Sequence, residues 1–288
     1  MKSKVYLIKD FSENSLLKLY NLYEDYLKGN VAIKVHSGEP GNQNFLRPHF
    51  WKKIIEKVNG TIVECNTAYA GARLKSEDHL ETLKKHGWCE YKVDLLDEKG
   101  PDMILDIPNG NIINKNYVGK NLAKYDSMLV LSHFKGHPMG GYGGALKQLS
   151  IGVASSYGKA YIHGAGDPRK IWTADHNSFL ESMAEAAKSV IDYFIGNILY
   201  INVMKNMSVD CDCCSIAEDP CMNDVGILIS LDPVAIDQAC IDLVYNSEDS
   251  GKNHLIERIE SRNGIYTIEK AAKFGCGSRN YELIELEK

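Results

Sequence analysis

The stretch Ser127-Met-Leu-Val-Leu-Ser-His-Phe-Lys-Gly-His-Pro-Met-Gly-Gly-Tyr-Gly-Gly-Ala-Leu-Lys147 joins an uninterrupted apolar run to a loop rich in glycine and histidine. A short apolar run bounded by such a loop predicts a strand that is buried on both faces, here over residues 127–131. In open α/β sheets, ligands bind beyond the carboxyl ends of the strands. This stretch therefore predicts both the kind of fold and the place of the functional site.

On both sides of this stretch, short β-branched runs alternate with segments of helical periodicity. The alternation predicts an α/β fold with a mostly parallel sheet, helices on both faces and Rossmann-like layering. Strands are expected over residues 4–8, 31–35, 61–65, 91–95, 127–131, 197–203, 226–230 and 282–286. Helices are expected after Ser12, from Pro48, around Lys147 after the glycines, over residues 76–86 and 178–190, from Asp232 onward, and over residues 255–259 and 267–274.

The expected organisation is a single α/β domain over residues 1–288, with any subdivision near residues 115–125. Residues 104–107 and 111–113 are expected to form a hairpin, because Asn109-Gly110 suits the positive φ angles of a tight turn.

Composition limits the classes of function. The 288 residues are 44% hydrophobic and 25% charged, with a formal net charge of -5, which describes a globular protein without the basic excess of a nucleic-acid binder. No apolar stretch approaches the length of a membrane span, and the N-terminus lacks the pattern of a signal peptide. We therefore expect a cytoplasmic protein with neither nucleic acid nor membrane as a partner. Its eight cysteines are expected to be thiols or metal ligands.

Four cysteines cluster within eleven residues, at Cys211, Cys213, Cys214 and Cys221. Clustered thiols in a reducing compartment predict a site for a soft metal ion. The acidic residues that flank Cys211 would raise the pKa of its thiol, which disfavours a nucleophile, whereas a divalent cation removes that penalty. Neither a zinc-ribbon pair nor a ferredoxin cysteine run is present, and a buried neutral thiol is the alternative interpretation.

Three histidines are candidates to complete the metal site. His133 and His137 follow the apolar run, and His163 follows another short apolar run, so all three are expected in loops near strand ends. Neutral imidazole is a common ligand of zinc and iron, although a single histidine is more often structural. We expect Cys211 and Cys213, with histidines from this set, to form a tetrahedral site for zinc or iron.

A second group of residues is expected to bind an anion. Gly140, Gly141, Gly143 and Gly144 would let the backbone approach a bound group closely, although they match neither a Walker loop nor a dinucleotide motif and could simply form a tight connection. Asn66 and Thr67 lie in a second strand-end loop and are also expected to bind the ligand.

The expected catalytic side chains are Lys147, Lys135 and Arg73. Lys147 lies just inside the helix that follows the glycines, and the planar guanidinium of Arg73 suits a carboxylate or phosphate. The alternative for these residues is surface solvation or helix capping.

Several ordered segments resemble the domain of unknown function 362 family over nearly the whole chain. They are Lys34-Val-His-Ser-Gly-Glu-Pro-Gly41, Glu64-Cys-Asn-Thr-Ala-Tyr-Ala-Gly71, residues 132–147, Asp210-Cys-Asp-Cys213 and residues 224–237. Many family members carry a ferredoxin module, so the resemblance implies redox or metal association, with an iron-sulfur cluster as an alternative to zinc or iron.

This chain is similar to the family form that lacks the ferredoxin module. Within the family pattern, Cys214 and Cys221 are additions, Ser155-Ser156 replaces a Ser-Arg pair, and Ala154 stands where a cysteine is expected. A ferredoxin-like electron-transfer partner is a further expectation.

The resulting functional hypothesis is a redox or Lewis-acid enzyme, such as a metal-dependent oxidoreductase, that acts on a small anionic molecule between the Cys211/Cys213 loop and the glycine-rich loop. One alternative is a metal-free enzyme that binds a phosphorylated or nucleotide-like ligand through the glycines and Lys147. Another is a non-catalytic docking or electron-transfer partner of a ferredoxin-like protein.

Overall fold

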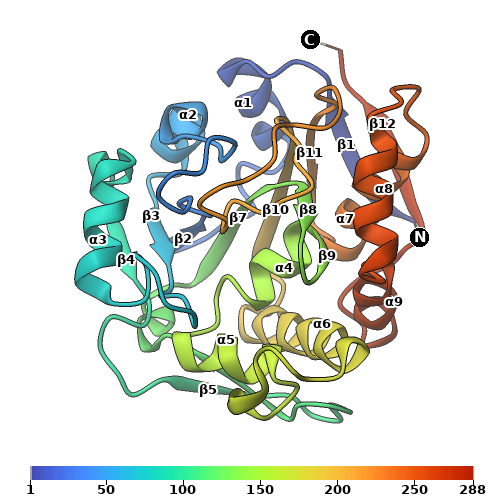
Figure 1. The fold of residues 1–288 in the computed structure, drawn as a ribbon. Coiled ribbons are helices and arrows are strands. Elements are labelled where there is room, and N and C mark those ends of the chain that lie inside the picture. Colours follow the sequence, from blue (N-terminus) through green and yellow to red (C-terminus); the bar gives the residue numbers. More distant parts are fainter. Residues whose placement is uncertain (1, 288) are drawn as a thin grey trace.

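The core of the molecule is an eight-stranded mixed sheet with strand order β12-β1-β11-β10-β7-β2-β3-β4 (Figure 1). The computed structural model describes residues 2–287. The strands are β1 (Ser3–Ile8), β2 (Val31–Lys34), β3 (Thr61–Glu64), β4 (Val93–Leu95), β7 (Ser127–His133), β10 (Ile198–Met204), β11 (Gly226–Ser230) and β12 (Tyr281–Glu285). Only β11 runs antiparallel to its neighbours in this sheet. The predicted α/β fold with a mostly parallel sheet is confirmed.

The two central strands, β7 and β10, are buried along their whole length. They pair in parallel, with Leu129 opposite Leu199 and Leu131 opposite Ile201. A strand covered on both faces can be apolar at every position, because neither face meets water. This explains why an unbroken apolar run marks the centre of the sheet.

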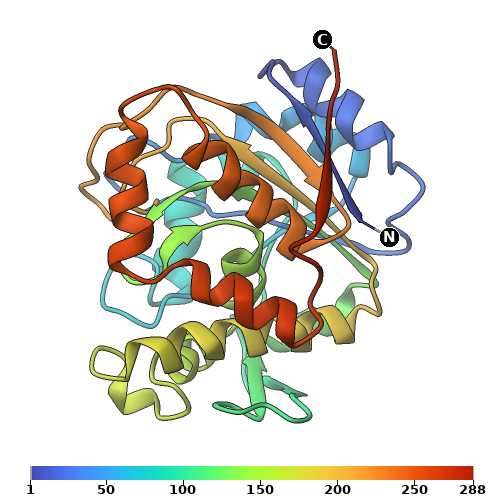
Figure 2. The same ribbon diagram turned by 90° about the vertical axis from the view of Figure 1, so that its right-hand side faces the viewer.

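Helices cover both faces of the sheet. Leu129 and Leu131 pack with α1 (Glu13–Asn21), α2 (Pro48–Val58) and α3 (Ser76–Lys85) on one face. Met128 and Val130 point to the other face, since side chains alternate along a strand, and pack with residues of the helices there. These helices are α4 (Ala145–Ser150), α6 (His176–Tyr193), α7 (Pro233–Tyr245), α8 (Lys252–Ser261) and α9 (Ile265–Lys273). Figure 2 shows α1 and α2 in blue on one side of the strands and α7 to α9 in orange to red on the other.

Several predicted helix starts are confirmed by their capping contacts. The Ser12 side chain accepts a hydrogen bond from the Ser15 N–H, and Asp232 accepts from Val234 and Ala235. Pro48 occupies the first turn of α2, where a missing N–H costs no hydrogen bond. No helix among residues 2–287 is both long enough and apolar enough to cross a membrane.

The predicted hairpin is present, but its second strand was placed too early in the sequence. β5 (Met103–Asp106) pairs with β6 (Lys115–Val118), not with residues 111–113. The N–H groups of Asn111, Ile112 and Ile113 instead donate to the Glu185 carboxylate on α6. These N–H groups are therefore satisfied by a residue distant in sequence and do not join the strand ladder.

The expectation that three histidines lie in loops is wrong. His133 is the last residue of β7, and His137 ends β8 (Lys135–His137), which pairs with β9 (Gly141–Gly143) in a small hairpin. His163 is the last residue of α5 (Ser156–His163), a helix that was not predicted. Its Gly158 and its short length weaken the helical pattern, although the Ser155 cap that begins it is a standard start signal.

Candidate functional site

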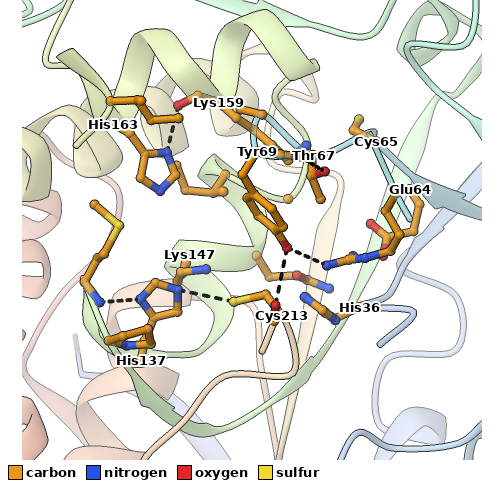
Figure 3. Close-up of a pocket in the computed structure, with 18 of the residues that line it drawn as sticks. His36, Glu64, Cys65, Thr67, Tyr69, His137, Lys147, Lys159, His163 and Cys213 are labelled. Atoms are coloured by element: carbon orange, nitrogen blue, oxygen red, sulfur yellow. Dashed lines mark hydrogen bonds and ion pairs between the residues drawn. The ribbon is translucent and has the colours of Figure 1, made fainter. Parts of the chain in front are cut away.

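A cavity of about 370 Å³, here called the main cavity, lies where β2, β3 and β8 end (Figure 3). The end of β2 contributes Lys34 and His36, and the β3 end contributes Glu64 and Cys65. The other polar lining residues are Thr67, Tyr69, Arg73, His137, Lys147, Gln148, Lys159, His163 and Cys213. The cavity therefore occupies the position that the rule for open α/β sheets predicts.

Two buried ion pairs lie along one wall of the cavity, which Lys34, Glu64 and Arg73 line. Lys34 Nζ lies 2.6 Å from Glu64 Oε2, and Arg73 Nε lies 2.8 Å from Glu39 Oε2. Burial favours the neutral acid, but the Lys34 ammonium and other nearby cations outweigh it and hold the pKa of Glu64 below its usual range. Arg73 also donates to the Tyr69 hydroxyl at 3.0 Å. Its guanidinium, expected to bind substrate, is thus largely engaged within the protein.

A second buried network is centred on Asp212. Its carboxylate accepts from His133 Nδ1 at 2.9 Å and from Lys135 Nζ at 2.8 Å. Burial would raise the pKa of Asp212, but these two partners hold it well below its usual range. Burial likewise opposes the charge on Lys135, but Asp212 outweighs burial and raises the pKa of that ammonium. Lys135 is therefore a partner of Asp212 and not a free cation for substrate.

The contacts of His133 exclude it from the expected set of metal ligands. Its Nε2 lies 2.6 Å from the Lys205 carbonyl oxygen, and its Nδ1 faces the Asp212 carboxylate. Both neighbours are hydrogen-bond acceptors, so both ring nitrogens are engaged within the protein and neither is free to bind a metal.

Three of the five expected metal ligands do come together. The ligand atoms of His137, Cys211 and Cys213 all lie within 4.8 Å of one another, and this group could hold a metal ion. Two sulfur atoms and one imidazole nitrogen suit zinc or iron, with a fourth position left open. The hydrogen bond with Cys213, and then burial, raise the pKa of Cys211 to about 11. The flanking acids contribute little to this rise in pKa. The negative charge of Asp212 is balanced by its buried partners, and Asp210 pairs with Arg258.

The hydrogen bonds of His137 define its tautomer. Nδ1 accepts from the N–H groups of Met139 at 3.1 Å and Gly140 at 2.8 Å. Burial and the nearby Lys147 lower the pKa of His137 to about 4, so the ring is neutral at pH 7 and its single proton lies on Nε2, 3.9 Å from Cys213 Sγ. Metal-binding histidines usually show the reverse, with the second nitrogen donating to an acceptor. A metal at Nε2 must displace this proton, so the two cysteines are the stronger part of the donor set.

His163 lies elsewhere in the cavity wall and has the opposite tautomer. Its Nδ1 donates to the Lys159 carbonyl oxygen at 2.7 Å, and its ring stacks on Phe179 at a centroid distance of 4.8 Å. Burial lowers the pKa of His163 to about 4, which leaves Nε2 unprotonated at pH 7. Figure 3 shows His163 on the side of the cavity near Lys159, away from Cys213. This histidine is therefore placed to accept a proton rather than to join the thiols.

The glycine-rich loop does not offer the expected anion cradle. The first N–H groups of the six-residue helix α4 donate to the buried Asp237 carboxylate, Ala145 at 2.7 Å and Leu146 at 3.0 Å. A Cβ atom at Gly144 would lie 2.5 Å from Asp237 Oδ1, and Gly141 has a φ of 79°. Close packing explains these two glycines, and none of Gly140, Gly141, Gly143 and Gly144 is among the described residues that line the main cavity.

Substitution of Asp237 by asparagine is expected to destabilise the protein by about 1–3 kcal/mol, because one amide N–H would face a backbone donor. Burial raises the pKa of Asp237 to about 6. Between the unfolded value and 6 the folded state binds more protons, so the stability this group provides at low pH is lost as the pH rises through 6. Melting curves should show that the difference in free energy of unfolding between wild type and Asp237→Asn decreases by about 1 kcal/mol from pH 5 to pH 7. A difference that stays constant over this pH range would contradict the role given to Asp237.

Asn66 and Thr67 have separate roles. The Asn66 side chain donates to Ser76 Oγ at 2.9 Å and contacts His79 Nδ1 at 3.1 Å, which ties its loop to α3. Thr67 lines the cavity, and its hydroxyl donates to the Tyr69 carbonyl oxygen. Of these two, only Thr67 is placed to meet a ligand in the main cavity.

Two lysines in the cavity wall lack carboxylate partners. Lys147 is half-buried, and its side-chain ammonium makes no hydrogen bond or ion pair within residues 2–287, while Lys159 Nζ donates there only to the Ala154 carbonyl oxygen. Lys159 was not predicted as a site residue, because the helix that carries it, α5, was not predicted. The ion pair between Lys34 and Glu64 was not predicted either, although a charged residue at the end of each of two apolar strands indicates such a pair.

The chain belongs to the DUF362 family, described as a domain of unknown function, whose model matches residues 31–242. No curated protein matches the chain. Among solved structures, it is similar to the lactate racemase apoprotein from Thermoanaerobacterium thermosaccharolyticum, with 16% identity, a TM-score of 0.49 and 85% of this chain covered. It is also similar to a protein from Thermotoga maritima, with 14% identity, a TM-score of 0.43 and 89% covered. The match covers 58% of the length of each of these two chains.

Proposed function

We propose that the protein is a metal-dependent enzyme that binds a small anionic substrate in the main cavity. The observation that carries this proposal is the placement of Lys147, a cation without a partner in the described residues, in the same cavity as Cys213 and His137. A half-buried ammonium is stabilised when an anion pairs with it, because removal from water weakens its hydration. A small carboxylate or phosphate would supply that pairing.

The residues of the site divide into three tasks. Lys147 and Lys159 bind the anionic group of the substrate. Cys211 and Cys213, with His137 beside them, hold zinc or iron, or iron in an iron-sulfur cluster, and the metal supplies Lewis-acid or electron-transfer chemistry. His163 Nε2 accepts a proton from the substrate.

The two other hypotheses have less support. Phosphate binding by the glycine-rich loop requires free N–H groups at the start of α4, and these donate to Asp237. A docking or electron-transfer role for a ferredoxin-like partner requires an exposed redox group, whereas Cys211 and His137 are buried.

An anion-binding experiment tests the proposal. Propionate and inorganic phosphate are titrated separately while the melting temperature is followed, since a ligand that binds only the folded state raises it. We expect a rise with at least one anion in the wild type, and little or none in Lys147→Met. The control is Lys85→Met, because Lys85 is an exposed lysine on α3. An equal rise in both variants, or none in the wild type, would contradict the proposal.

A further inference from the structure

The main cavity is lined by apolar side chains as well as by its lysines. Pro138, Met139, Ile151, Ile171 and Trp172 all line it. Ligand pockets commonly combine a mainly apolar lining with a few polar groups that orient the ligand. The combination predicts a ligand that is itself amphipathic.

Trp172 is the most unusual member of this apolar set. Its side chain is 66% exposed, whereas the other two tryptophans, Trp51 and Trp88, are 2% and 0% exposed. An exposed indole ring keeps a large apolar area in contact with water, and covering it with another ring is favourable. Trp172 therefore offers a free stacking surface at the edge of the cavity.

The segment that carries Trp172 is held in place by hydrogen bonds. It follows the 3-10 helix η3 (Pro168–Lys170), which Asp167 caps. The N–H groups of Thr173 and Ala174 both donate to the Lys170 carbonyl oxygen, at 2.9 and 3.0 Å. Trp172 thus lies in a hydrogen-bonded turn, so a ligand does not have to order this segment before stacking on it.

We propose that the ligand of the cavity is a carboxylate that carries an aromatic ring, with its anionic group at Lys147 and Lys159 and its ring against Trp172 and Ile171. This inference rests on the proposed function, because it assumes that the ligand is an anion. A volume of about 370 Å³ is at the small end of ligand pockets. Two cations without carboxylate partners match a singly or doubly charged acid better than a polyphosphate.

Three probe molecules separate the two halves of the proposed ligand. 3-Phenylpropionate has both the ring and the charge, propionate lacks the ring, and 3-phenylpropionamide lacks the charge. Calorimetric titration is expected to show 3-phenylpropionate binding at least about tenfold more tightly than either of the others. 3-Phenylpropionate should also protect the protein's tryptophan fluorescence from quenching by acrylamide, because Trp172 is far more exposed than Trp51 and Trp88.

Trp172→Ala provides the matched variant, since an exposed residue can be truncated without loss of the core. It should remove the affinity advantage of the ring while leaving propionate binding unchanged. Equal affinities for propionate and 3-phenylpropionate, or an advantage that survives in Trp172→Ala, would overturn the ring site and leave the anion site standing. Binding of the amide as tightly as the acid would overturn the anion half. If neither acid binds but inorganic phosphate still raises the melting temperature, the carboxylate ligand is wrong and the anion site stands. If no anion binds, the proposed function fails together with this inference.

Discussion

Substitution of Asp212 by alanine is expected to destabilise the protein by about 3–5 kcal/mol, because it leaves buried cations without their counter-charge. Asp212 is 1% exposed and accepts from both His133 and Lys135. A loss of this size is a large fraction of the stability of an ordinary domain. Urea unfolding at pH 7 should therefore show a strongly lowered midpoint. The site should also be disturbed, since Asp212 lies between Cys211 and Cys213 in the sequence.

Asp210→Ala is the matched control for this substitution. Asp210 lies on the other side of Cys211 and pairs with Arg258 at 3.1 Å, but both side chains are about one-fifth exposed. Water can solvate the remaining arginine, so we expect a loss of about 1 kcal/mol or less. Equal losses in the two variants would contradict the view that Asp212 is the centre of a buried charge network.

Substitution of Glu64 by glutamine is expected to cost about 3–5 kcal/mol as well, because Lys34 would remain as a fully buried, uncompensated cation. Glutamine keeps the shape of the side chain and an oxygen that can accept from the Ser37 N–H. The change therefore isolates the charge from the packing. Chemical unfolding of the purified variant measures the effect.

The double variant Lys34→Met with Glu64→Gln should recover much of that stability, because it removes the stranded charge. Buried ion pairs can often be replaced by neutral side chains of similar size at little net cost. A complete double-mutant cycle should give a coupling free energy of at least about 2 kcal/mol between the two positions. Additive single-variant effects would show that the pair does not act as a unit.

The fold was predictable because its central features depend on local patterns. The unbroken apolar run of β7 marked the middle of the sheet, and Ser12, Pro48 and Asp232 marked helix starts. The misplaced second strand of the β5–β6 hairpin has a non-local cause, since Glu185 binds the backbone of residues 111–113 from about 70 positions away.

The position of the site was also predictable, because strand-end loops meet at one edge of a parallel sheet. The roles of individual side chains were less so. His133 contacts Asp212, which lies 79 positions away in the sequence, and Arg73 donates to Glu39, which lies 34 positions away. Such partners determine whether a charged side chain is free for a ligand, and they follow from the tertiary fold rather than from spacing along the chain. Lys147 differs because no group among residues 2–287 pairs with its side-chain ammonium.

X-ray absorption spectroscopy of anaerobically purified protein tests most directly whether the cysteines hold a metal. We expect zinc or iron in near-stoichiometric amount, with two sulfur neighbours at about 2.3 Å and lighter atoms in the remaining positions. An iron-sulfur cluster would add iron–iron scattering and visible absorption. The metal should be lost in Cys211→Ser with Cys213→Ser and retained in Cys221→Ser, which changes a cysteine outside the group. A metal-free wild type, or a metal with only oxygen and nitrogen neighbours that survives the double substitution, would contradict this expectation.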